Sequence, residues 1–331
     1  MKTTVNAKGT KSLLARGSSI FLLGTLLFLG ACSSGLAPQL PEADLSVQSS
    51  SCLSGSGKLI KLSGTYNKTV VIKKQNGVRV DARSARINAS PALIANYNSG
   101  FFCLSGGVYD VGLSLSASWS TYHSHTAIAL FNTPRATVEG VAVLNTGDGI
   151  SVKQNNPGWV FRDSYVKHAG DDGIENDRGS GGRVSNVLID SAFMGVSCRK
   201  EGSNPLKRNS FTIENSLIAM DAKRSAYAFK WTTGTKEPGC VLTLKNNVFL
   251  LPKNAGYMDI GDHPQVYSRP LNESACSGNK NTIVYTGGDK SYLEQLKKAS
   301  PACYNVTTDK SVWTRARDAW FSRHSEFSKY R

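Results

Sequence analysis

The chain has 331 residues, with 39 lysines and arginines against 24 acidic residues and a formal net charge of +15. Hydrophobic residues make up 40% and are spread along the chain, which excludes a disordered protein and is enough for a large core. The one long apolar run, residues 20–31, is too short and too close to the N-terminus for a protein with several membrane spans. The positive charge favours a polyanionic partner without identifying it.

Residues 1–31 are organised like a secretory signal. Four basic residues and no acid come first, and the following apolar run ends in Leu-Gly-Ala-Cys at positions 29–32. This ending resembles the lipobox of bacterial lipoproteins, which implies that Cys32 is lipidated and anchors the protein to a membrane. In that family Ser33 implies outer-membrane sorting, so we expect a lipid-anchored protein of the bacterial cell envelope, facing the periplasm or the surface. An ordinary signal peptide with an incidental cysteine is the alternative.

The segment after the signal, residues 32–57, is rich in serine, proline and glycine and predicts a flexible tether. Cleavage before Cys32 leaves 35 basic against 24 acidic residues, a net charge of +11. Most of the positive charge therefore belongs to the mature chain.

Six cysteines follow Cys32, and an even number in an exported protein is typical of disulfides. No Cys-x-x-Cys motif occurs, which argues against zinc or redox chemistry. We predict pairing in chain order, although other connectivities are open: Cys52–Cys103, Cys198–Cys240 and Cys276–Cys303.

Short strands separated by turn residues recur over residues 58–265, and helical patterns are missing there. The glycines that open the second strand of each repeat, Gly149, Gly173 and Gly195, are 24 and 22 residues apart. A repeat of this size is typical of one coil of a parallel solenoid, whereas a propeller blade needs about 40 residues. A β-sandwich or propeller is the alternative. The expected turn residues after the first strands are Gly140, Asp163, Asp190, Asn215 and Asn246.

The C-terminal extension, residues 266–331, contains helical patterns at 290–299 and 309–330. The second of these carries one apolar stripe, which we expect to pack against the solenoid or cap it. A helix at a membrane surface is the alternative. The stripe consists of Trp313, Ala316, Trp320, Phe321, His324 and Phe327.

Three segments carry a resemblance to a known fold: Gly-Thr-Tyr at 64–66, Val-Val-Ile at 70–72 and Gly-Val-Arg-Val-Asp at 77–81. They resemble the opening coils of right-handed parallel β-helix proteins of the pectin-lyase-like superfamily. The resemblance covers residues 58–265 and implies an all-β protein, a right-handed parallel β-helix with a short helical C-terminal region.

Alternation along the second strand of each repeat separates inward from outward side chains. The residues expected inside are Ile150, Val152, Ile174, Val196, Cys198, Phe229 and Trp231. Those expected outside, on successive coils, are Ser151 and Lys153, Glu175 and Asp177, Ser197 and Arg199, and Lys230. Stacking of the coils then gathers carboxylates and cations into one patch.

Two segments sharpen this expectation, Asn-Thr-Gly-Asp-Gly-Ile at 145–150 and Gly-Asp-Asp-Gly-Ile at 170–174. They resemble the Asn-Thr-Asp-Gly and Gly-Gln-Asp-Asp motifs of polygalacturonase-type glycoside hydrolases, and residues 229–234 resemble the end of their Arg-Ile-Lys motif. The resemblance implies acid and base roles for Asp148, Asp171 and Asp172, and substrate binding by Lys230.

The chain departs from that family's pattern at three places. Met194 replaces the histidine, Ala228 replaces the arginine, and Gly147 is an extra residue in the first motif.

Two kinds of chemistry fit these residues. Inverting hydrolysis needs an acid and a base about 6.5–9.5 Å apart, and clustering of the aspartates with Glu175 should raise the pKa of at least one carboxyl. In a lyase, a cation neutralises a uronate carboxylate while lysine or arginine removes the neighbouring proton. Lys153, Arg199 and Lys230 could neutralise the carboxylate, and Arg199 or Lys230 could remove the proton.

Other candidates surround this patch. Glu175 and Asp177 could hold Ca²⁺, and His168 is a candidate for substrate binding or acid–base work. His123 and His125 lie one coil before Asp148 and are expected at the edge of the same groove.

The sequence therefore predicts an exported, monomeric β-helix that binds an acidic polysaccharide and cleaves it as hydrolase or lyase. A non-catalytic polysaccharide-binding or envelope-structural β-helix is the alternative. Export argues against a nucleic-acid partner.

Overall fold

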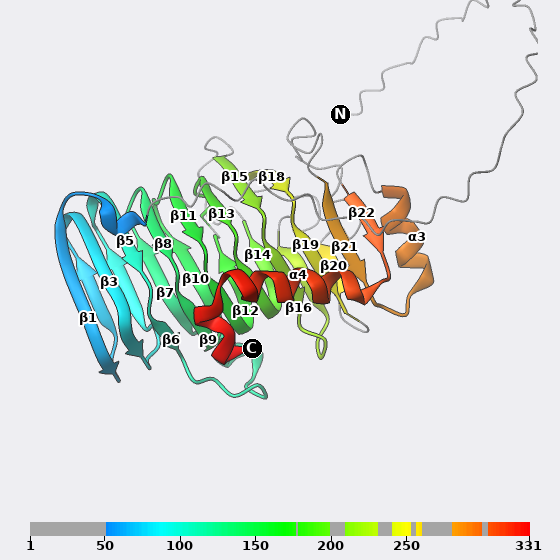
Figure 1. Ribbon diagram of the computed structural model, residues 1–331, viewed down its shortest axis with the longest axis horizontal. Coiled ribbons are helices and arrows are strands. Elements are labelled where there is room, and N and C mark those ends of the chain that lie inside the picture. The colour runs from blue at the N-terminus through cyan, green and yellow to red at the C-terminus, as the bar shows by residue number, and fades with distance from the viewer. Residues whose placement is uncertain are drawn as a thin grey trace, which may run out of the picture. The chain divides into compact units, whose positions relative to one another are not determined.

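The computed structural model describes residues 51–176, 178–198, 209–230, 240–252, 256–259, 280–299 and 304–331 (Figure 1). Residues 43–331 form one compact unit, which contains all of these segments. Five predictions concern residues outside the described ones: the signal with Cys32, most of the tether, the site residues Asp177 and Arg199, the inward position of Trp231, and the third disulfide.

Nearly all regular structure consists of short strands. In chain order the first are β1 (Lys58–Tyr66), β2 (Val70–Lys73), β3 (Asn76–Ile87), β4 (Leu93–Asn96), β5 (Ser99–Ser105), β6 (Val108–Asp110), β7 (Thr126–Phe131), β8 (Ala136–Glu139), β9 (Ala142–Thr146), β10 (Asp148–Lys153) and β11 (Trp159–Arg162). The series continues with β12 (Tyr165–Glu175), β13 (Gly182–Ser185), β14 (Leu188–Ser197), β15 (Asn209–Glu214), β16 (Leu217–Met220), β17 (Ala226–Lys230), β18 (Cys240–Lys245), β19 (Val248–Leu251), β20 (Gly256–Asp259), β21 (Asn281–Tyr285) and β22 (Tyr304–Thr307). The helical elements are η1 (Cys52–Ser54), α1 (Trp119–His123), α3 (Lys290–Ala299), α4 (Lys310–Arg323) and η3 (Ser325–Tyr330).

The strands pair in parallel with those one coil away and form three ladders. The first ladder contains β1, β3, β5, β8, β11, β13, β15 and β18. The second runs from the end of β3 through β6, β9, β12, β14, β16, β19 and β21 to β22. The third contains β2, β4, β7, β10, the ends of β12 and β14, β17 and β20. The predicted parallel solenoid is confirmed.

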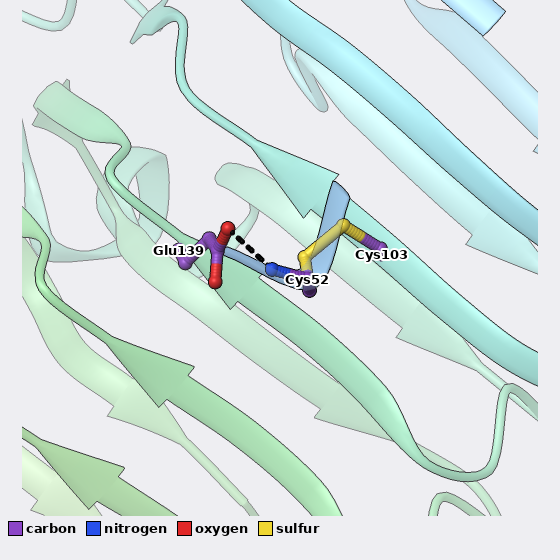
Figure 2. Close-up of side chains that lie close together, drawn as sticks. All are labelled: Cys52, Cys103 and Glu139. Atoms are coloured by element: carbon purple, nitrogen blue, oxygen red, sulfur yellow. Dashed lines mark hydrogen bonds between the residues drawn. A yellow bond between two sulfur atoms is a disulfide. The ribbon is translucent and has the colours of Figure 1, made fainter. Parts of the chain in front are cut away.

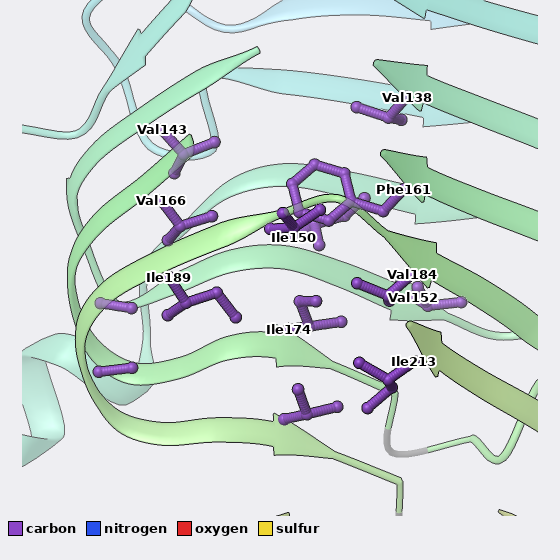
Figure 3. Close-up of a cluster of buried hydrophobic side chains, with 14 of the residues drawn as sticks. Val138, Val143, Ile150, Val152, Phe161, Val166, Ile174, Val184, Ile189 and Ile213 are labelled. Carbon is purple, nitrogen blue, oxygen red and sulfur yellow. The ribbon is translucent and has the colours of Figure 1, made fainter. Parts of the chain in front are cut away.

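The core lies inside the coils, where in-register strands stack apolar side chains (Figure 3). Val138, Phe161 and Val184 follow one another in the first ladder, and Ile150 pairs with Ile174 in the third. The six described residues that alternation placed inside the coils all belong to this core, and Trp231 lies outside the described residues.

Corner residues with positive φ turn the chain between ladders. Gly140, Asp163, Asn215 and Asn246 occupy such corners as expected, but Asp190 does not. Asn186, with φ 54°, takes that corner, because the preceding strand is β13 and Asp190 lies inside β14. Asparagine tolerates this left-handed conformation better than most residues.

The N-terminal part of the described chain is held by a disulfide and a buried acid (Figure 2). Cys52 is bonded to Cys103 of β5, and its N–H donates to Glu139 Oε1 at 2.9 Å. Arg162 donates to the other oxygen of Glu139. The predicted pairs Cys52–Cys103 and Cys198–Cys240 are both confirmed. The tether therefore ends before Ser51, which already hydrogen-bonds to Glu139, and not at residue 57 as predicted.

The coils continue beyond residue 265, where the sequence placed the end of the β-helix. β21 pairs with β19, and β22 pairs with β21, so the second ladder extends into the C-terminal segment. This continuation was missed because each of the two last strands is a short run separated by residues without a recognisable repeat.

The two expected C-terminal helices are present. Tyr292 and Leu296 of α3 belong to the interior core, so α3 contributes to the closure of its end. The buried stripe of α4 and η3 packs on outward apolar residues of the second ladder, including Tyr165, Leu188 and Val248 (Figure 1). His324 stacks on Trp320 at 4.3 Å, and burial lowers the pKa of its imidazole.

Candidate active site

Three aspartates from two neighbouring coils meet at the start of the third ladder. Asp148 begins β10, while Asp171 and Asp172 lie in β12. Ile150 pairs with Ile174, so Asp148 and Asp172 occupy equivalent positions, each two residues earlier. One carboxylate oxygen of each aspartate lies within 4.8 Å of those of the other two. We name this group the aspartate cluster.

Glycines next to these aspartates allow the coils to approach closely. A Cβ on Gly149 would lie 2.4 Å from the carbonyl oxygen of Gly173, and a Cβ on Gly173 would lie 2.7 Å from that of Gly195. Contacts below 3.0 Å do not occur for real Cβ atoms, so each position requires glycine unless the coils move. The recurring glycine of the repeat is therefore a packing requirement of the strand that carries the cluster.

The cluster is buried. The exposed fractions are 5% for Asp148, 4% for Asp171 and 0% for Asp172. Asp148 Oδ2 accepts a hydrogen bond from the Ser151 hydroxyl at 3.0 Å, and its Oδ1 accepts one from the Asp172 N–H at 3.3 Å. These two bonds fix the orientation of the Asp148 carboxyl group.

Burial and like charges raise the pKa of Asp148 well above its ordinary value. Burial is the largest cause, followed by repulsion from Glu175, Asp172 and Asp171, while Lys153 acts weakly in the opposite direction. A carboxyl in such surroundings keeps its proton into the pH range where general acids work. The sequence predicts that clustering raises the pKa of at least one carboxyl, and Asp148 is a carboxyl whose pKa is raised.

The distances within the cluster differ from those expected. The nearest oxygens lie within 4.8 Å, shorter than the about 6.5–9.5 Å between carboxyl groups that leaves room for a water in an inverting hydrolase. The cause is that paired strands stack directly, so equivalent side chains start about 4.8 Å apart. The short distance is also what makes the carboxylates repel one another strongly.

Two lysines from the same face contact the acids. Lys230 Nζ of β17 lies 3.4 Å from Asp172 Oδ2 and is itself buried, and Lys153 forms an ion pair with Glu175. The structure thus brings Lys153, Glu175 and Lys230 together with the aspartate cluster.

A histidine outside the matched motifs completes the site. His123 Nδ1, in α1, lies 2.7 Å from Asp171 Oδ2, and the imidazole is about half exposed. The Trp119 ring stacks on this imidazole with 4.6 Å between centroids and is itself 55% exposed. The sequence placed His123 at the edge of the groove but assigned it no partner.

The helix that carries His123 was not expected, because five residues are too few to show a helical period. The Ser118 side chain caps it by accepting from the Thr121 N–H. In the sequence, Ser118 is a residue type that favours the N-terminus of a helix, and this weak signal could have indicated α1.

Tyr122 of α1 explains the extra glycine of the first motif. A Cβ on Gly147 would lie 1.8 Å from the Tyr122 carbonyl oxygen, and one on Gly170 would lie 1.9 Å from the Tyr122 ring. Gly147 and Gly170 therefore make room for the segment that delivers His123 to Asp171.

Other predicted residues lie elsewhere. His168 has a φ of 59° at a kink of β12, and the charges that act on it are those of Lys167, Asp190, Asp221 and Lys223. Burial lowers the pKa of His168. His125 Nδ1 lies 2.6 Å from the Thr121 carbonyl oxygen, within its own loop. The imidazoles of His168 and His125 therefore form no contact with the aspartate cluster among the hydrogen bonds of the described residues, although the His125 carbonyl oxygen accepts from the Asp148 N–H at 2.8 Å.

The suggested calcium pair includes Asp177, which lies outside the described residues, and its other member, Glu175, forms an ion pair with Lys153. The aspartate cluster has the oxygen ligands that divalent cations prefer. At Asp172, however, the Lys230 ammonium already supplies a positive charge at 3.4 Å.

Comparison with known proteins supports the fold. Residues 52–211 match the family described as the right handed beta helix region. With the parallel ladders described above, the protein is a right-handed parallel β-helix. No curated protein and no solved structure matches the chain significantly. Within the described residues, no helix is long and apolar enough to cross a membrane.

Proposed function

We propose that the protein is an exported enzyme that cleaves glycosidic bonds in an acidic polysaccharide. The observation that carries this proposal is the aspartate cluster, in which Asp148 has a raised pKa beside two further carboxylates. A glycosidase needs such a pair of carboxyl groups in different protonation states. The right-handed β-helix fits a polysaccharide-acting family and agrees with this chemistry.

In the hydrolytic reaction, Asp148 is the acid. Its proton passes to the glycosidic oxygen as the bond to the sugar carbon breaks. Because the carboxylates are too close to hold a water between them, Asp171 attacks the sugar carbon directly, and Asp148 then takes the proton of the water that hydrolyses the resulting ester. His123 orients the Asp171 carboxylate through the 2.7 Å contact. Lys230 forms an ion pair with Asp172 and so compensates the charge of the third carboxylate of the cluster.

The lysines of the site favour an anionic substrate. Lys153 is about one-third exposed and offers its ammonium to a sugar carboxylate at the expense of its bond to Glu175. The exposed Trp119 ring adds an apolar face next to His123, of the kind on which sugar rings pack. A uronate-containing polysaccharide offers both a carboxylate for Lys153 and a sugar ring that can pack on Trp119.

The test is digestion of a panel of uronate-containing polysaccharides by wild-type protein and by Asp172→Asn. New reducing ends in the wild-type digest, lost in the variant while binding is retained, support an enzyme. Ultraviolet absorbance of an unsaturated uronate separates the two chemistries, because a lyase creates that double bond and a hydrolase does not. Failure of the wild type to shorten any of these chains contradicts the proposal.

A second candidate, a non-catalytic polysaccharide-binding or envelope-structural β-helix, is favoured by one observation. All three aspartates are at most 5% exposed, and α1 lies beside them. In that case the aspartates stabilise the stack, and the wild type binds a glycan without shortening it.

The proposal includes attachment to the bacterial envelope through a lipid on Cys32. We expect Cys32→Ser to abolish lipid labelling and to release the protein from the membrane fraction. Unchanged processing and membrane association in this variant would refute the anchor. We also propose that the protein acts as a monomer, which light scattering measures directly.

A further inference from the structure

The first coils carry a concentration of positive charge that the candidate active site does not use. Residues 58–98 contain eight lysines and arginines and a single acid, Asp81. The three arginines have partners: Arg83 pairs with Asp81, Arg86 pairs with Asp110, and Arg79 donates to two backbone carbonyls. The five lysines are exposed and form no ion pair among the residues that the structure describes.

Three of these lysines gather at one corner of the solenoid. Lys73 ends β2, and Lys74 takes the corner position with a φ of 54°. Lys58, at the start of β1, reaches the same corner, because its Nζ donates to Gln75 Oε1 at 3.3 Å. The corner therefore presents three ammonium groups from the first coil.

Exposed apolar side chains flank this corner on the two ladders that meet there. Val71 points outward on the same face of β2 as Lys73, Leu59 follows Lys58 in β1, and Tyr97 occupies the corner position next to Lys74 on the following coil. Their exposed fractions are 47%, 42% and 59%. We call these six residues the corner patch: Lys58, Leu59, Val71, Lys73, Lys74 and Tyr97.

We propose that the corner patch docks on a lipid surface that carries anionic headgroups. Lysines attract such a surface, and their alkyl stems extend over apolar groups while the ammonium stays at the headgroups. Aliphatic and tyrosine side chains bury at the same interface. Lysine alone on a terminal strand would serve to prevent pairing with another sheet, but exposed leucine, valine and tyrosine work against that purpose.

The position of the patch fits this partner. The described chain starts at Ser51, and η1 packs on the first coils through the Cys52–Cys103 disulfide. In the sequence, Cys32 precedes Ser51 by 19 positions. A lipid on Cys32 would hold these coils near the membrane, but the patch proposal stands without that lipid and without any enzymatic activity.

The experiment measures binding of residues 43–331, the compact unit that holds the whole described core and both described disulfides. This piece lacks the apolar leader, which would bind vesicles by itself. Sedimentation compares vesicles of phosphatidylcholine alone with vesicles that also contain phosphatidylglycerol. We expect binding to the anionic vesicles only, and weaker binding as salt rises.

The patch variant is Lys58→Gln with Lys73→Gln and Lys74→Gln. Glutamine suits the corner, because Gln154 has a φ of 56° at the equivalent position of a later coil. We expect its affinity for anionic vesicles to fall at least roughly tenfold. The matched control replaces three exposed lysines near the C-terminus, Lys290, Lys298 and Lys310, with glutamine and should bind like the wild type.

Leu59→Ser with Val71→Thr tests the apolar part while the charges stay in place, and should weaken binding severalfold. Thermal melting monitored by circular dichroism verifies that each variant is folded. The proposal is overturned if the wild type does not bind anionic vesicles or if the control loses as much affinity as the patch variant. It is also overturned if the apolar variant binds like the wild type, since the surface then recognises charge alone.

Discussion

Asp148 combines nearly complete burial with three neighbouring carboxylates, so its ionised form is disfavoured for two separate reasons. The same carboxyl is oriented by the Ser151 hydroxyl and by the Asp172 N–H. A proton held in a fixed direction is what a general acid requires. The charge state of Asp148 therefore links the stability of the coil to its proposed chemistry.

This link predicts a pH dependence of stability. The folded state keeps a proton on Asp148 that the unfolded chain releases above the ordinary pKa of 3.8. The contribution of Asp148 to the free energy of unfolding should therefore fall as pH rises from about 4 through the raised pKa of the folded state. Asp148→Asn lacks this titration and should lose less stability than the wild type between about pH 5 and about pH 8.

Urea unfolding at the two pH values measures the difference between the two proteins, which cancels the contributions of titrating groups that do not interact with Asp148. Equal losses of stability in wild type and variant would show that Asp148 is ionised throughout this range.

His123 offers a second test at the same scale. It touches Asp171 and not the buried core, so His123→Gln should leave the fold intact and misplace the Asp171 carboxylate. We expect kcat to fall about tenfold to a hundredfold with little change in KM, together with a shift in the limb of the pH profile due to Asp171.

The control is His125→Gln, because His125 lies two residues later in the same loop and bonds to the Thr121 carbonyl instead of an aspartate. An equal loss of kcat in both variants would assign the effect to the loop and remove His123 from the mechanism.

At the scale of single elements, the coils around the site stack closely because glycine stands where backbone meets backbone. A methyl group on Gly173 would lie 2.7 Å from the Gly195 carbonyl oxygen and 3.0 Å from the Ile189 side chain. Gly173→Ala should therefore destabilise the protein by about 1–3 kcal/mol through overpacking.

Gly288→Ala is the matched control, because a Cβ there has no atom within 4 Å. Chemical denaturation of the two variants measures the difference. Equal stabilities would mean that neighbouring coils can separate at Gly173 without cost.

The C-terminal helix α4 contributes through the apolar stripe that covers the second ladder. Trp320 is fully buried against Tyr165 and Phe327, and its indole N–H donates to the Asn186 carbonyl oxygen at 3.2 Å. Trp320→Ala should lower the free energy of unfolding by about 3–5 kcal/mol.

Thr314→Ala changes an exposed position of the same helix and should alter stability by less than about 0.5 kcal/mol. If the two variants unfold alike, α4 is not part of the cooperative unit. This comparison also separates packing on the solenoid from docking at a membrane, which would leave Trp320 exposed in solution.

For the whole molecule, sequence reasoning succeeded where each coil repeats the last. Recurring glycines and alternating apolar residues predicted the parallel solenoid, and the two described disulfides followed from chain order. The meeting of Asp148 with Asp171 and Asp172 could be anticipated because the repeat length places them one coil apart.

Features outside the repeat could not be predicted in the same way. The contact between His123 and Asp171 depends on a five-residue helix in an insertion, and no periodic signal reports where such a loop folds. Asp190 was misplaced at a corner because Asn186 starts that corner four residues earlier, a shift that local composition does not show. The last strands, β21 and β22, belong to coils without a recognisable repeat.

The central claim is that the aspartate cluster cleaves a uronate-containing polysaccharide with Asp148 as its acid. The most direct measurement compares wild-type protein with Asp148→Asn, counting new chain ends and measuring binding to the same polysaccharide. The account predicts that the wild type shortens the chains, and that the variant binds them but cleaves them at least about a hundredfold more slowly. Cleavage by the variant at the wild-type rate, or no cleavage of any such polysaccharide by the wild type, would contradict it.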